Sequence, residues 1–151
     1  MGVILLERAT LAHYEARLDA LRPDSARRWG SLTPIGLLAH LTRTFELTLE
    51  ELPCKDESIP VLRVLFRFLA YHVLPWPKGK IKVPDYFMGD AAGDFEAERL
   101  KVKAALERFC VALEQNPTRK TLHPMFGKLT LRYWRRVHGM HLDHHFNQFG
   151  V

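Results

Sequence analysis

The stretch LRYWRRVHGMHLDHHFNQ, residues 131–148, decides how this chain of 151 residues is expected to fold. At 100° per residue its positions separate into two arcs of a helix. The inward arc holds Trp134, Val137, His141, His145 and Gln148, and the opposite arc holds Arg132, Arg136, Asp143 and Asn147. The pattern predicts a last helix that begins at Leu129-Thr130, runs to about Gln148 and turns two imidazoles towards the interior.

His141 and His145 are four residues apart, so their Cβ atoms lie roughly 5–6 Å apart on a helix. A neutral imidazole has one donor and one acceptor, and burying it without partners costs about 1–3 kcal/mol per unsatisfied group. A divalent metal meets this demand, and so do hydrogen bonds to Tyr, Thr or backbone groups. The HxxxH pair by itself therefore leaves both interpretations open.

A third histidine comes from a second helix, which Thr33-Pro34 is expected to start and which should end at about Leu52. His40 lies seven residues, roughly 10 Å, into this helix, and the histidine pair lies near the end of the last one. If the two helices run antiparallel, the three side chains meet at the same level. The spacing thus predicts a metal site made of His40, His141 and His145.

Two further long helices are expected from the apolar spacing, one over roughly 5–22 and one that begins after a capping Asp94. No strand pattern competes with these helices. The sequence therefore predicts an all-α fold, a four-helix bundle with a long crossover between its second and third helices. The length suits one domain over residues 1–151.

The crossover should carry a short extra helix in the strongly apolar segment Val61 to Trp76. With Arg63 and Arg67 and only the length of a core helix, this segment is not expected to insert stably in a membrane. An interfacial contact, packing within the domain and a homodimer contact all remain open for it.

Other polar residues near the inward arc have weaker interpretations. His138 and His144 flank the arc, so they are candidates for contacts with a ligand histidine or a substrate, or else partly exposed residues. Gln148 is a candidate for orienting a ligand or a substrate oxygen. Cys54 and Cys110 have no CxxC spacing and are expected to be reduced thiols.

Composition narrows the location and the partners. Residues 1–20 lack the features of a secretory signal, so a cytoplasmic location is expected. Lys and Arg total 22 against 17 Asp and Glu, a mild positive excess that would help attract small anionic molecules. It falls short of the dense basic surface that nucleic-acid-binding proteins usually show. In the segment RYWRRVH, residues 132–138, the arginines should face solvent while Trp134 faces inward, so a nucleic-acid contact is the less favoured interpretation.

The combination of His40 with H-x-x-H-H-x-x-Q at 141–148 resembles the DinB/YfiT-like metalloenzyme superfamily. An uncharacterised branch is the most similar, through WGSLTP at 29–34, AHL at 39–41 and HPMFGKLT at 123–130. The resemblance implies a DinB-like bundle, often dimeric, with a divalent metal on His40, His141 and His145. It also implies transfer or isomerisation chemistry that uses a low-molecular-weight thiol.

One departure concerns the residues after the last ligand. Many relatives have Arg-Gly-Gln there, whereas this chain has Phe146-Asn147-Gln148, so the role of that arginine does not carry over.

The leading hypothesis is a metal-dependent transferase or hydrolase for a small-molecule substrate. In it, zinc or nickel on three histidines activates a thiol cosubstrate or water. The alternative is a non-enzymatic bundle that binds a metal or a small molecule.

Overall fold

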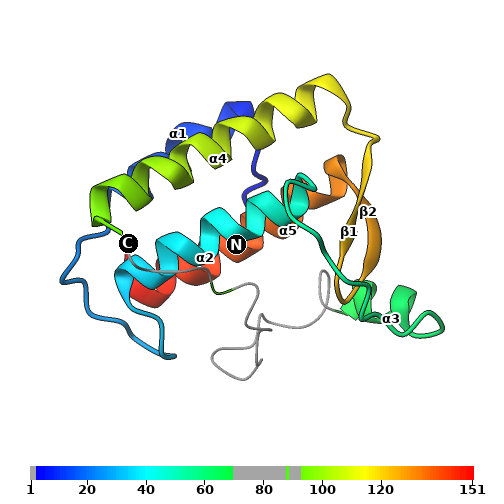
Figure 1. The fold of residues 1–151 in the computed structure, drawn as a ribbon, viewed down its shortest axis with the longest axis horizontal. Helices are drawn as coiled ribbons and strands as arrows, with labels where there is room; N and C mark the ends of the chain where they lie inside the picture. The colour runs from blue at the N-terminus through cyan, green and yellow to red at the C-terminus, as the bar shows by residue number, and fades with distance from the viewer. Residues whose placement is uncertain (1–2, 70–87, 89–92) are drawn as a thin grey trace.

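The computed structural model describes residues 3–69, 88 and 93–151. Figure 1 shows α1 along α4 and α2 along α5, with a small hairpin at one end of these helices and α3 beside the hairpin. The elements in chain order are η1 (Arg8–Thr10), α1 (Leu11–Ala20), α2 (Pro34–Thr48), α3 (Arg63–Phe68), α4 (Phe95–Gln115), β1 (Lys120–His123), β2 (Gly127–Thr130) and α5 (Leu131–Phe149).

The predicted all-α four-helix bundle is wrong, because two strands form an antiparallel sheet between α4 and α5. Lys120 of β1 pairs with Thr130 of β2, and His123 pairs with Gly127 at the turn. Each strand has only four residues, too few for alternation of apolar and polar side chains to stand out. Pro117 before β1, Pro124 between the strands and Gly127 at the start of β2 are residues typical of loops, so they concealed the strands.

The hairpin turn depends on Gly127, whose φ of +68° lies in the left-handed region that favours glycine. The buried side chains of Phe126 and Leu129 attach the hairpin to the core. From α3, Arg67 Nε donates to the carbonyl of Phe126 over 2.7 Å. The predicted helix from Val61 to Trp76 is α3 only in part, and its portion from residue 70 onwards lies outside the described residues.

The long helices after α1 begin at side chains that accept a hydrogen bond from the first turn. Thr33 Oγ1 accepts from the backbone N–H of Gly36 over 3.1 Å. A carboxylate oxygen of Asp94 caps α4 in the same way, and Thr130 Oγ1 caps α5. The predicted caps at Thr33 and Asp94 are confirmed, and α5 begins one residue beyond the expected Leu129-Thr130 pair.

The core lies between the long helices and continues under the hairpin. α2 contributes an unusually broad buried face, because it packs against both α4 and α5. α2 and α5 run in opposite directions, which brings the first half of α2 beside the second half of α5 (Figure 1). In the part of the chain that the structure describes, no helix has the length and apolarity needed to cross a bilayer.

Candidate metal centre

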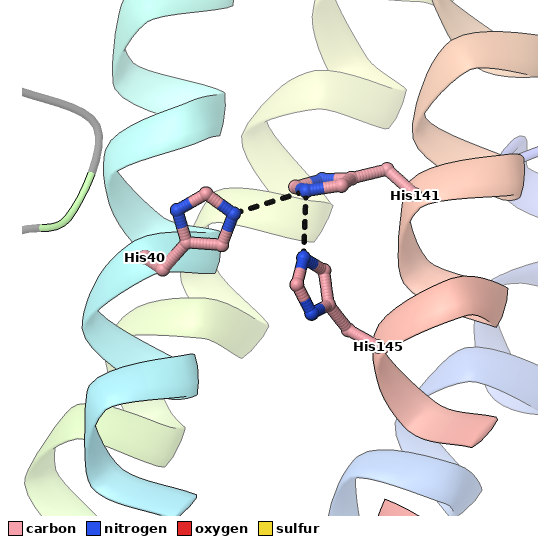
Figure 2. A group of neighbouring side chains, drawn as sticks. All are labelled: His40, His141 and His145. Carbon is pink, nitrogen blue, oxygen red and sulfur yellow. Dashed lines mark hydrogen bonds between the residues drawn. The ribbon is translucent and has the colours of Figure 1, made fainter. Parts of the chain in front are cut away.

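Three histidine rings meet between α2 and α5. His40 reaches across from α2 to His141 and His145 of α5, and Figure 2 shows the three rings turned towards one another. Nε2 of His141 lies 3.0 Å from Nε2 of His40 and 3.0 Å from Nε2 of His145. One ring nitrogen from each of the three histidines lies within 4.8 Å of the other two. The expected convergence of the three side chains is therefore observed.

The ring of His145 is held by an amide. Gln148 Nε2 donates to the carbonyl of Trp29 over 2.8 Å, and because a carbonyl can only accept, the amide oxygen must face His145. That oxygen, Oε1, lies 2.9 Å from His145 Nδ1. Nδ1 consequently carries the proton, and the lone pair of Nε2 points into the cluster.

Without a cation, His141 Nε2 has more nitrogen neighbours at hydrogen-bonding distance than it can bond to. This nitrogen carries either a proton or a lone pair, so it can make one well-aligned hydrogen bond, whereas it has two imidazole nitrogens at 3.0 Å. A divalent ion removes the conflict, because each ring then presents a lone pair to the same centre. Three nitrogens around a tetrahedral zinc at about 2.0–2.1 Å lie roughly 3.3–3.4 Å apart, a few tenths of an ångström more than the two 3.0 Å separations from His141 Nε2.

Burial keeps the two α5 imidazoles of the cluster, those of His141 and His145, neutral. It lowers the pKa of His145 to about 3, with a smaller contribution from the neighbouring His40. The pKa of His141 is also lowered well below its usual range, chiefly by burial and then by His145 and His40. Protons therefore do not compete for these nitrogens near neutral pH, which is the state that a metal ligand requires.

Comparison with known families shows a match over nearly the whole chain. A family model described as "Protein of unknown function (DUF1569)" matches residues 6–150. The chain belongs to the DUF1569 family. None of the curated proteins and none of the solved structures matches it.

Two other candidate histidines of this DUF1569 chain have different surroundings. His144 is half-buried on the rim, with its ring edge-on to Trp29 at 5.8 Å and to His145 at 5.0 Å between centroids. His138 is 1% exposed, so its interpretation as a partly exposed residue is wrong. Its ring stacks on Phe45 of α2, with centroids 4.2 Å apart. The inward arc of α5 is thus wider than the spacing of the other histidines suggested.

Residues 28–30 take part in the site, although the sequence pattern did not assign them a role. Besides the carbonyl of Trp29, the backbone N–H of Arg28 is bonded to the Gln148 carbonyl at 2.7 Å. Gly30 has a φ of +73°, and a Cβ there would lie 2.5 Å from Gln148 Nε2. The only signal in the sequence is the Trp-Gly pair just before the second helix, which does not reveal a partner 119 residues away.

Proposed function

We propose that this DUF1569 member is a metal-dependent enzyme of the DinB/YfiT-like type that catalyses transfer or hydrolysis on a small molecule. The observation that carries the proposal is the convergence of three imidazole nitrogens within 4.8 Å of one another. Two of the three rings, those of His40 and His145, are buried, and the tautomer of His145 leaves its lone pair at the centre. Such a donor set fits a divalent ion.

Three neutral ligands suit an ion that keeps its full charge and one open position. When bound, such an ion lowers the pKa of a thiol or water towards neutrality and so supplies a nucleophile. The chain's own contribution is to hold the three rings in place, to fix the tautomer of His145 through Gln148, and to enclose the site within the helices. Imidazole nitrogens suit zinc or nickel.

The chain's cysteines are poor nucleophiles. Burial raises the pKa of the Cys110 thiol to about 11, and burial together with nearby Glu57 and Asp56 raises that of Cys54. Neither thiol is appreciably ionised at neutral pH, and the thiolate is the reactive form. A thiol nucleophile therefore comes from a cosubstrate, with water as the other option.

A turnover screen tests this function. Protein loaded with zinc or nickel is incubated with electrophiles in the presence of low-molecular-weight thiols, and separately with hydrolysable esters and amides in water. We expect product formation that requires the metal and disappears in His145→Ala. A metal-loaded protein that is inactive with every combination would contradict the enzyme proposal.

The second candidate is a protein that binds a metal or small molecule without turnover. The observation in its favour is the burial of His40 and His145, which are 4% and 8% exposed, because it restricts access of a substrate to the cluster. Tight metal retention without turnover in the same screen would favour this candidate.

A further inference from the structure

His138 has unused hydrogen-bonding capacity in the interior. Both ring nitrogens, Nδ1 and Nε2, are buried without a hydrogen-bond partner among the described residues. A neutral imidazole offers one donor and one acceptor, and leaving both unpaired destabilises the folded state. Unpaired buried groups of this kind are few in native proteins and mark positions that await a ligand or a water.

Aromatic rings from three helices fix the orientation of this imidazole. Phe45 of α2 and Trp134 of α5 stack on it with interplanar angles of 22° and 23°. Phe109 of α4 meets it edge-on, with centroids 4.8 Å apart. Because these three rings enclose it, the imidazole of His138 cannot easily rotate towards another hydrogen-bond partner.

Trp134 lies about one turn before His138 on α5. Its Nε1 is also buried without a partner in the described part of the chain, and the side chain is 3% exposed. The two rings lie 5.2 Å apart between centroids. Together they provide two N–H donors, which match the two lone pairs of one carbonyl oxygen, such as that of an amide.

His138 and Trp134 lie next to the three-histidine cluster along α5. His138 precedes His141 by three residues, which is a rise of about 4.5 Å on a helix. On the facing helix, Phe45 follows His40 by five residues, so the rings around His138 lie just beyond the cluster on the hairpin side.

We propose, on the basis of the metal function above, that His138 and Trp134 bind an amide group of the substrate about one helical turn from the atom that reacts at the cluster. The N–H groups of His138 and Trp134 donate to the amide carbonyl oxygen, which has a lone pair for each of them. The rings of Phe45 and Phe109 supply apolar walls. The substrate class is thus a small amide with its reactive group roughly 4–6 Å away.

Two thiols that differ in the amide test this binding mode. Thiolates are good ligands of zinc-like ions, so N-acetylcysteamine and 1-butanethiol can both be titrated into cobalt-loaded protein and followed by visible absorption. We expect the wild type to bind N-acetylcysteamine at least about tenfold more tightly than 1-butanethiol. A tenfold difference corresponds to about 1.4 kcal/mol, which is the size of the cost when buried polar groups stay unpaired. His138→Phe should abolish this preference, and His138→Gln, which retains a donor and an acceptor, should restore part of it.

His13→Phe is the matched control, because it removes an exposed imidazole of α1 and should leave the preference unchanged. Equal affinities of the wild type for the two thiols, with cobalt bound, would overturn the inference and leave the proposed metal function intact. A wild type that takes up no cobalt would overturn the proposed function and this binding mode with it.

Thermal unfolding of the metal-free protein gives an independent readout. If the nitrogens of His138 are unpaired, an apolar replacement should raise the melting temperature by about 2–4 °C in His138→Phe or in the smaller His138→Leu. A lower melting temperature in both variants would show that the imidazole is already satisfied, for example by a buried water, and would overturn the inference.

Discussion

Gln148 and His145 are joined by a 2.9 Å hydrogen bond between the amide Oε1 and the ring Nδ1. The two residues lie one turn apart on α5, and the other end of the amide is anchored to the Trp29 carbonyl. This link gives the cluster a defined tautomer at one of its three rings. On the proposed metal function, it should also make the metal affinity sensitive to residues that do not touch the metal.

Replacing Gln148 should weaken the metal site without removing a ligand. Without the amide oxygen, Nδ1 of His145 loses its acceptor, and the ring can rotate or take the other tautomer. We expect Gln148→Leu to lower zinc affinity about 10–100-fold, measured by competition with a chromophoric chelator. The control Gln115→Leu, at an exposed position near the end of α4, should retain wild-type affinity. Equal affinities of the two variants would contradict the orienting role of Gln148.

A methyl group at position 30 should disturb the same link from the opposite side. Gly30 and Gly127 have similar positive φ angles, +73° and +68°, so Gly→Ala strains the backbone at both. A Cβ at position 30 meets the Gln148 amide, whereas one at position 127 meets the Arg63 guanidinium. Both variants should melt at lower temperature, but only Gly30→Ala should lose zinc affinity. A loss of affinity in both, or in neither, would argue against the link.

Acid should destabilise the metal-free protein partly through His138. Burial, and to a smaller extent the neighbouring His123, lowers its pKa to about 3, below the ordinary value of 6.5, so the unfolded chain binds a proton that the folded chain excludes. Its contribution to stability is complete above pH 6.5 and is lost as the pH falls, by about 1.4 kcal/mol per pH unit. Between pH 6.5 and 4.5 the free energy of unfolding of His138→Phe should fall by about 2–3 kcal/mol less than that of the wild type.

Chemical denaturation at several pH values measures this difference, and His13→Phe serves as the control. His13 is exposed on α1, so its replacement should leave the pH dependence of the wild type in place. Parallel curves for His138→Phe and the wild type would show that His138 does not take up a proton on unfolding in this range.

The helices and the three-histidine cluster were predictable because they depend on local rules. Thr33 and Asp94 are capping residues whose side chains accept from the first turn, and four-residue spacing brings His141 and His145 to one face. His40 could be added because antiparallel helices bring a residue near the start of one beside residues near the end of the other. These relationships need only helix geometry and chain direction.

The hairpin and the surroundings of His145 were not predictable in the same way. β1 and β2 are stabilised by pairing with each other and by the Arg67 contact at Phe126, neither of which four-residue segments reveal. The Trp29 carbonyl is a backbone group, so no residue type marks it as the partner of Gln148. The burial of His138 likewise depends on how Phe45, Phe109 and Trp134 pack in three dimensions.

The most direct test of the central claim is the metal content of untagged protein, measured by mass spectrometry beside His40→Ala and His145→Ala. The three converging imidazoles predict about one divalent ion per chain in the wild type, and much less in each variant while both remain folded by circular dichroism. A wild-type protein that is empty and also fails to take up added zinc or nickel would contradict the metal centre. The three histidines would then serve hydrogen bonding alone.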